Sequence, residues 1–200
     1  MMVIIVTGGI GSGKSQVCNI LRNMGIRAQY NADIRAKALY DDHPTLLSDI
    51  EKSLGCILKD ENGCFQPAKL ASVIFAERDA LEKVENHLFP VLIEDFKSFA
   101  ENCGEEIVVF ESATVLEKHQ FEGFGDKIIL VDAPFELRLK RACLRDDVDP
   151  EKVLARMRNQ KLMNELSEGH EDPRIDYKIL NDSSLEELER RTELAINSLI

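Results

Sequence analysis

Residues 8–15 read Gly-Gly-Ile-Gly-Ser-Gly-Lys-Ser, a run of residue types suited to holding phosphate groups. The run matches the pattern G-x-x-x-x-G-K-[ST], in which glycines let successive backbone N–H groups curl around anionic oxygens. At this spacing Lys14 is expected to reach the β- and γ-phosphates of a nucleoside triphosphate. The hydroxyl of Ser15 is expected to hold Mg²⁺, a cation that prefers oxygen ligands.

The residues on either side of this loop predict the elements that would position it. Residues 3–6 form a short, apolar and β-branched run that predicts a strand, and residues 15–24 follow a helical pattern. The strand would deliver the chain to the loop, and the positive end of the helix dipole would face the phosphates. A glycine-rich turn that fits the pattern by chance is the alternative, and the strand–loop–helix order argues against it. The sequence therefore predicts that the chain binds a nucleoside triphosphate.

The rest of the chain alternates between strand and helix patterns, which is typical of a parallel sheet covered by helices. Further strands are predicted over residues 26–30, 107–110, 128–131 and 177–180, and helices over residues 33–40, 134–145, 149–163 and from 184 onward. Residues 44–102 look mainly helical, which is more chain than one crossover needs, so part of them is expected to form a lobe. We therefore predict an α/β fold, a three-layer α/β/α arrangement with a five-stranded parallel sheet.

Composition and charge restrict the class of protein. The chain has 200 residues, enough for one domain with a substantial core, and a formal net charge of −11. Such an acidic chain is not expected to bind nucleic acid or an anionic membrane surface, because basic residues drive both interactions. No apolar run reaches the roughly 18 residues of a membrane span, and the N-terminus enters a strand directly, so we expect a cytoplasmic protein. The five cysteines and four histidines are scattered, which predicts neither a disulfide framework nor a zinc site.

Two carboxylates follow predicted strands, at the edge of a parallel sheet where ligands bind. Asp33 comes just after the second strand, and Glu111 ends the third. Asp33 could accept the proton of a hydroxyl that attacks a phosphate, or it could cap the helix that follows. Glu111 could organise Mg²⁺ through water, or it could be a polar residue that ends a strand. The spacing alone leaves both alternatives open.

Arginines repeat at helical spacing beyond the fourth predicted strand. Arg138, Arg141 and Arg145 fall within an arc of roughly 60° on one side of a helix. Arg156 and Arg158 follow on the next predicted helix. One interpretation is a solvated surface paired with neighbouring acidic residues. The other, which the set as a whole favours, is a mobile lid that closes over a triphosphate and offsets its charge in the transition state.

Several segments taken together resemble the dephospho-CoA kinase family. The matching parts are residues 7–15, 31–34, 139–141 and 145–147, the turn at 60–63, the Ile-Phe pair at 74–75, Gln160 and residues 176–181. The resemblance covers essentially the whole chain and implies a P-loop kinase fold of the nucleoside-monophosphate-kinase type. It also implies that ATP and Mg²⁺ are used to phosphorylate the ribose 3′-hydroxyl of dephospho-CoA. This reaction gives coenzyme A and ADP in the last step of coenzyme A biosynthesis.

The resemblance further implies roles for single residues. Asp33 takes the role of general base, and Lys14 and Arg141 act with it in catalysis. ATP is bound by Gly9, Ile10, Gly11, Ser12, Gly13, Lys14, Ser15, Gln16, Arg145 and Asn181, and Ser15 also binds Mg²⁺. Residues 1–200 form one domain, within which a helical lobe of residues 34–105 holds the coenzyme A part and residues 138–165 form a helical lid. We expect a monomer or a weak homo-oligomer.

Three positions depart from the family's usual residues. Asn31 stands where the family usually has a first Asp, so Asp33 is the only candidate base in its motif. Phe89-Pro90 replaces a frequent His-Pro step, and Ala-Thr-Val-Leu-Glu at residues 113–117 replaces Pro-Leu-Leu-Phe-Glu. The last two bear on the substrate contacts and not on the reaction.

Two other functions would also use a phosphate loop. A kinase of the same fold could act on another small acceptor, such as a nucleoside monophosphate. A nucleotide-dependent switch would need a guanine-reading Asn-Lys-x-Asp, and the nearest string, Asn-Gln-Lys-Leu at residues 159–162, does not match. The sequence therefore favours a small-molecule kinase.

Overall fold

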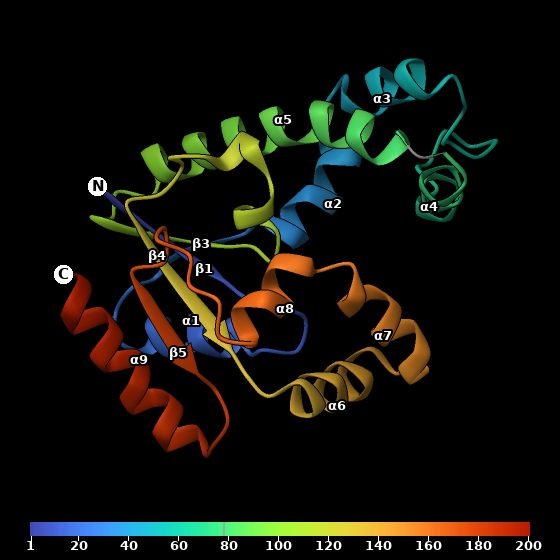
Figure 1. Ribbon diagram of the computed structural model, residues 1–200. Helices are drawn as coiled ribbons and strands as arrows, with labels where there is room; N and C mark the ends of the chain where they lie inside the picture. The colour runs from blue at the N-terminus through green and yellow to red at the C-terminus, as the bar shows by residue number, and fades with distance from the viewer. Residues whose placement is uncertain (78) are drawn as a thin grey trace. The chain divides into compact units, whose positions relative to one another are not determined.

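The computed structural model describes residues 1–77 and 79–200, and the chain divides into two compact units (Figure 1). The first unit comprises Met1–Asn31 and Cys103–Ile200, and the second comprises Ala32–Asn102. The first contains the sheet, whereas the second is built from helices. None of the described helices is both long enough and apolar enough to cross a lipid bilayer.

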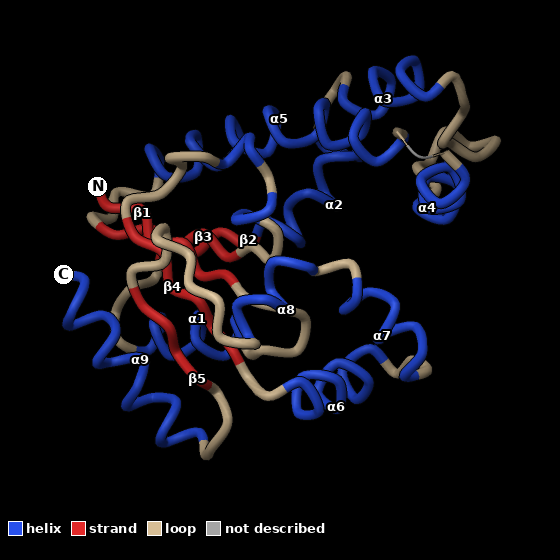
Figure 2. The backbone as a smooth tube through the Cα atoms, viewed as in Figure 1, coloured by secondary structure: helices blue, strands red, loops and turns tan. Residues whose placement is uncertain are grey.

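The first unit is organised around a parallel sheet, which has five strands within the described residues (Figure 2). The strands are β1 (Met2–Thr7), β2 (Ala28–Asn31), β3 (Ile107–Glu111), β4 (Lys127–Asp132) and β5 (Tyr177–Leu180), in the order β2-β3-β1-β4-β5. The inner strands are rich in Val and Ile and almost wholly buried, as expected where both faces of a sheet are covered. The predicted α/β class and its five parallel strands are confirmed.

The strand order determines which residues meet at the carboxyl edge of the sheet. β1 lies at the centre, between β3 and β4. Glu111, the last residue of β3, pairs in register with Val6 of β1 on one side and with Asn31 of β2 on the other. Ligands of open parallel sheets bind beyond this edge. The loop that leaves β1 is therefore next to the end of β3.

One face of the sheet is covered by α1 (Lys14–Asn23) and α9 (Leu185–Leu199), which contact each other (Figure 1). The apolar side chains that they bury against the sheet include Val17, Ile20, Leu21, Leu188 and Ala195. Their helical spacing explains why both segments are helices with one apolar side. The predicted start of α9 is confirmed, since Ser184 accepts a 3.3 Å hydrogen bond from the backbone N–H of Glu187.

The other face of the sheet carries, within the first unit, the short 3₁₀ turns η1 (Val115–Glu117) and η2 (His119–Phe121). Phe110 of β3 packs edge-on against Phe124, with ring centroids 4.7 Å apart. The chain passes close to the sheet at Gly125, where an added Cβ would lie only 2.6 Å from the side chain of Ile5.

After β4 the chain forms α6 (Phe135–Asp146), α7 (Pro150–Arg158) and α8 (Lys161–Ser167). The single helix predicted for residues 149–163 is wrong, because the chain leaves helical conformation at Gln160 (φ −90°, ψ 67°). The Oε1 atom of Gln160 accepts a 2.8 Å hydrogen bond from the backbone N–H of Ile10. The interruption of the helix at Gln160 therefore coincides with a contact to the phosphate loop. No local sequence pattern predicts this interruption.

The second unit contains α2 (Ala32–Asp42), α3 (Leu46–Leu54), α4 (Pro67–Ala76) and α5 (Ala80–Asn102). α5 contacts α2, α3 and α4. Arg35 of α2 makes a two-point ion pair with Asp95 of α5, with both N–O distances at 2.8 Å. The mainly helical character predicted for residues 44–102 is confirmed for the described part of the chain.

Candidate active site

The phosphate loop connects β1 to α1, and its first and last glycines lie too close to the ends of other strands for a side chain. Gly8 (φ 150°) lies against β4, since a Cβ on it would be 2.1 Å from the carbonyl oxygen of Val131. Gly13 (φ 101°) begins α1 and lies against Asn181, whose amide nitrogen would be 2.1 Å from a Cβ. The loop is thus held between the ends of β4 and β5, with the N–H groups of α1 beside it.

Lys14 is the first residue of α1, and its ammonium lies over the loop. The Nζ atom donates to the carbonyl oxygens of Gly8 at 2.9 Å and Gly9 at 3.3 Å. The first turn of α1 carries no acidic residue, so the ammonium and the helix N-terminus both contribute positive potential. Gln16, two residues further along α1, is exposed. This end of the helix suits a polyanionic group.

Ser15, Glu111 and Asn31 form a hydrogen-bonded chain at the carboxyl edge of the sheet. The Ser15 hydroxyl donates to Oε1 of Glu111 at 2.6 Å, and the Asn31 amide donates to Oε2 at 2.7 Å. Glu111 is only 8% exposed, so its carboxylate depends on these donors. An aspartate in place of Asn31 would set a second negative charge beside Glu111. The amide instead offers a donor, which is a physical reason for the departure at this position.

The oxygen atoms of Ser15 and Glu111 are hard donors of the kind that Mg²⁺ takes from proteins. Among the described residues no group of three or more His, Cys, Asp or Glu side chains could hold a metal ion by itself. Mg²⁺ commonly binds through one or two protein groups together with substrate phosphates and water. The residues present therefore fit Mg²⁺ bound together with a nucleotide.

Asn181, just beyond β5, links the loop to α6. Its Nδ2 donates to the carbonyl oxygen of Ser12 at 2.8 Å, and Arg141 donates to its backbone oxygen at 3.0 Å and to Oδ1 at 3.2 Å. Asn181 is buried and Arg141 half-buried, and burial lowers the pKa of the Arg141 guanidinium. The structure thus brings together three predicted site residues: Ser12, Arg141 and Asn181.

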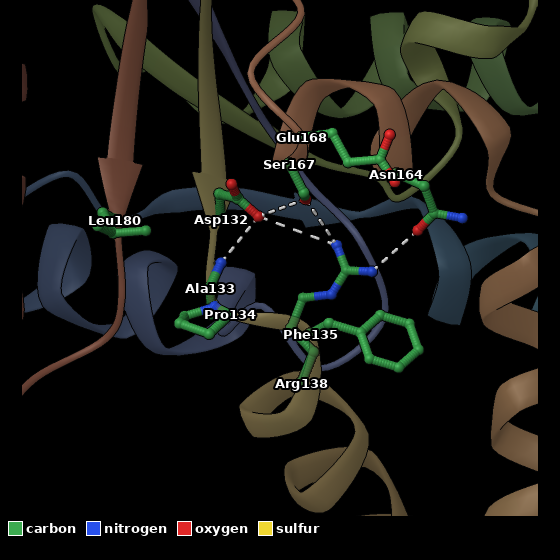
Figure 3. Close-up of a pocket in the computed structure, with 9 residues that line it drawn as sticks. All are labelled: Asp132, Ala133, Pro134, Phe135, Arg138, Asn164, Ser167, Glu168 and Leu180. Atoms are coloured by element: carbon green, nitrogen blue, oxygen red, sulfur yellow. Dashed lines mark hydrogen bonds and ion pairs between the residues drawn. The ribbon is translucent and has the colours of Figure 1, made fainter.

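The three arginines of α6 occupy three different environments, and Arg138 is buried where its spacing allowed a solvated position. Its side chain is 1% exposed and points to the end of β4 and to α8 (Figure 3). Arg138 is therefore not part of a solvated surface, one of the two interpretations of its spacing, whereas the mobile lid stays a prediction. Arg145, in contrast, is 60% exposed in its side chain and pairs with Asp146 at 2.7 Å. The helical period places the arginines on one side of α6, and their exposure rises along that side from the buried Arg138 through the half-buried Arg141 to the exposed Arg145.

Asp33 belongs to the second unit, where it is the second residue of α2 and is exposed. α2 begins one residue earlier, at Ala32, so Asp33 lies inside the first turn and is not the N-cap residue.

Glu111 was expected at the end of the third strand with a role toward Mg²⁺ left open, whereas the contacts of Gln160 and Arg138 with the phosphate loop were not predicted. The pattern that pointed to Glu111 is an acidic residue at the carboxyl end of a buried strand. No local sequence pattern pointed to the contacts of Gln160 and Arg138, because these contacts depend on how α6 and α8 pack.

The chain is similar to known proteins along almost its whole length. Residues 2–187 match a family model described as dephospho-CoA kinase. The dephospho-CoA kinase of Porphyromonas gingivalis is 37% identical over 172 residues, which cover 86% of this chain and 84% of that protein. A solved structure from Thermus thermophilus superposes with a TM-score of 0.81 at 27% identity, covering 100% of this chain and 98% of the other. The dephospho-CoA kinase structure from Campylobacter jejuni, at 22% identity, has the same fold, with a TM-score of 0.66 over 98% and 96% of the two chains.

Proposed function

This chain belongs to the dephospho-CoA kinase family, and we propose that it transfers the γ-phosphoryl group of ATP to the ribose 3′-hydroxyl of dephospho-CoA. The products are coenzyme A and ADP, in the last step of coenzyme A biosynthesis. The observation that carries the proposal is the juxtaposition of the Lys14 ammonium, the Ser15–Glu111 pair and the Arg141–Asn181 pair around one phosphate loop.

We assign the triphosphate to the loop and the nucleoside to the neighbourhood of Asn181. Lys14 is bonded to carbonyl groups of its own loop, and it would exchange these contacts for the β- and γ-phosphate oxygens. Arg141 and Asn181 lie beside Ser12 at the other side of the loop, where the base and ribose of ATP would lie. Positioning and electrostatics would then supply nearly all of the rate enhancement.

Ser15 and Glu111 are the residues that we assign to Mg²⁺. When bound, Mg²⁺ supplies positive charge that offsets the charge of the phosphates. The hydroxyl of Ser15 would bind the cation directly, and Glu111 would orient that hydroxyl and bound water.

Asp33 is the residue that we assign as general base. It would accept the proton of the 3′-hydroxyl as that oxygen attacks the γ-phosphorus, and the bond between the γ-phosphorus and the bridging oxygen of ADP would break. We also keep two larger assignments: the helical lobe of residues 34–105 for the coenzyme A part, and a lid within residues 138–165. Since Arg138 is buried and Gln160 is bonded to the loop, the moving part of that lid would lie between these two residues.

The direct test is to incubate the purified chain with ATP, Mg²⁺ and dephospho-CoA and to look for coenzyme A by mass. The same assay with adenosine monophosphate, other nucleoside monophosphates and small sugars, read through ADP formation, decides the acceptor. Coenzyme A as the dominant product is the expected result. Equal or faster turnover of a nucleoside monophosphate would contradict the assignment of the acceptor. A cytoplasmic location and a monomeric or weakly associating state stay predictions, the second of which size-exclusion chromatography tests.

A further inference from the structure

A buried guanidinium lies at the base of the phosphate loop, and the reaction proposed above does not use it. Arg138 donates from Nη1 to the hydroxyl of Ser167 at 3.0 Å and from Nη2 to Oδ1 of Asn164 at 3.1 Å (Figure 3). Both partners lie on α8. Nη1 is also 3.9 Å from a carboxylate oxygen of Asp132, at the end of β4. Burial lowers the pKa of Arg138 and Asp132 opposes this, so the site holds a charge at a cost in desolvation.

The charge is held in place by a small network. Oδ1 of Asp132 accepts hydrogen bonds from Ser167 at 2.7 Å and from the backbone N–H of Ala133 at 2.9 Å. Its Oδ2 pairs with the ammonium of Lys178 at 2.9 Å. Arg138 and Ser167 thus both contact the carboxylate of Asp132, which Lys178 and the backbone N–H of Ala133 hold in place. An arginine in such a network has little freedom to move, so it can fix whatever packs against it.

What packs against it is the phosphate loop. A Cβ on Gly9 would lie 2.6 Å from Nη1 of Arg138 and 2.9 Å from its Cζ. A Cβ on Gly11 would lie 2.1 Å from the backbone oxygen of Arg138. Gly11 has a positive φ of 76° and would need glycine in any case, but Gly9 does not have a positive φ. The need for glycine at position 9 therefore comes from the Arg138 side chain and not from the backbone conformation.

We propose that Arg138 is a positioning residue for the phosphate loop. Its guanidinium is held by α8 and by the end of β4, and Gly9 packs directly against it. It thereby sets the conformation in which the loop receives the triphosphate. Gln160, the residue just before α8, makes a second link to the same loop by accepting a hydrogen bond from Ile10, so Arg138 and Gln160 fix two consecutive loop residues. This inference rests on the proposed use of the loop for ATP.

The first test compares two ligands and not only two proteins. Arg138→Met keeps much of the side-chain length and removes every N–H donor, and Arg190→Met is the matched control at an exposed position of α9. Equilibrium dialysis measures the binding of ATP and of adenosine, which carries no phosphate. We expect R138M to weaken ATP binding about tenfold and to leave adenosine binding within about twofold, while R190M changes neither. A merely structural role would lower the melting temperature without separating the two ligands.

The second test is a double-mutant cycle. Gly9→Ala should weaken ATP binding strongly in the wild-type background, because its methyl group meets the fixed guanidinium. In the R138M background the flexible thioether can yield, so the same substitution should do clearly less harm. Additive effects of G9A and R138M would overturn the proposal, as would an equal loss of ATP and adenosine affinity.

Two outcomes separate this inference from the proposed function. If the wild-type chain binds no ATP, the proposed function and this inference both fall. If wild type binds ATP and R138M binds it equally well, the positioning role alone falls. Should R138M fail to fold, Asn164→Ala keeps Arg138 and removes one of its acceptors, and the comparison of ATP with adenosine decides in the same way.

Discussion

The hydroxyl of Ser15, in the first turn of α1, donates a 2.6 Å hydrogen bond to Glu111 at the end of β3. The two residues are 96 positions apart and meet because β3 is the neighbour of β1. A carboxylate that directs the hydroxyl of a phosphate loop sets where the oxygen lone pairs of that hydroxyl point. In the proposed reaction, this pair determines how the chain holds Mg²⁺.

Glu111→Gln is expected to change the dependence of the rate on Mg²⁺. Glutamine keeps the shape of the side chain and removes its charge, so the concentration of Mg²⁺ at half-maximal rate should rise about 10- to 100-fold. Initial rates over a Mg²⁺ titration at saturating ATP measure this. Glu106→Gln, an exposed acid just before β3, is the control and should behave as wild type. An unchanged Mg²⁺ titration in E111Q would remove Glu111 from the metal site.

Asp33→Asn tests the base. The amide cannot accept the hydroxyl proton, so kcat should fall about 10²- to 10⁴-fold, while the KM for ATP stays within about twofold. Asp41→Asn, an exposed acid near the other end of α2, is the matched control. Steady-state rates with dephospho-CoA decide the matter: if D33N retained kcat within a few-fold of wild type, a different group would have to take the proton.

Local patterns were sufficient for most of the fold. The apolar runs at residues 3–6 and 107–110 are buried on both faces of the sheet, which is why continuous Val and Ile mark them as strands. The phosphate loop needed only its glycines and its place between a strand and a helix. These features depend on neighbours in sequence, so the sequence reports them directly.

Features that depend on packing between distant segments were not predictable in the same way. The place of Glu111 in the site depends on the strand order, and the break at Gln160 coincides with a hydrogen bond to a residue 150 positions away. The helical period grouped Arg138 with Arg145, yet the first is 1% exposed and the second solvated. Periodicity gives the direction of a side chain around its helix axis and not the surface that it meets.

Asn181→Ala should weaken ATP binding more than it slows turnover. The substitution removes the donor to Ser12 and one acceptor of Arg141, and it leaves buried polar groups unpaired. We expect the KM for ATP to rise about tenfold with a smaller change in kcat. Asn102→Ala, at the exposed end of α5, serves as control. A fall in kcat at constant KM would contradict a role in holding the nucleoside.

The ion pairs of the Asp146 carboxylate should make part of the folding stability sensitive to acid. Hydrogen bonds from Arg145 and Arg156 lower the pKa of Asp146 from 3.8 to about 2, and the bond from Arg156 joins α7 to α6. Because the folded-state pKa is the lower one, this contribution to stability is present above pH 4 and is lost as the pH falls toward 2. The free energy of unfolding of Asp146→Asn should lie below that of wild type by less than about 1 kcal/mol at neutral pH. Urea unfolding over a pH series should show the two proteins converging between these values. A difference that stayed constant down to pH 2 would rule out the ion pairs as its cause.

Cys18 should be the least reactive cysteine of the folded chain. It lies on the buried side of α1, and its pKa is raised far above the usual range by burial first and then by the charge and hydrogen bond of Glu111. Since the thiolate is the reactive form, Cys18 should resist a thiol reagent at pH 8, whereas the exposed Cys64 should react within the first minutes. Peptide mapping after timed alkylation measures the labelling rate of both cysteines. In urea, the Cys18→Ser protein should take up one label fewer than wild type, which confirms the assignment of the slow site. In the E111Q protein part of the increase in pKa should disappear, but burial should still protect the thiol. Rapid labelling of Cys18 in the folded wild-type protein would mean that α1 opens away from the sheet, which the packing of Val17 and Leu21 beside it argues against.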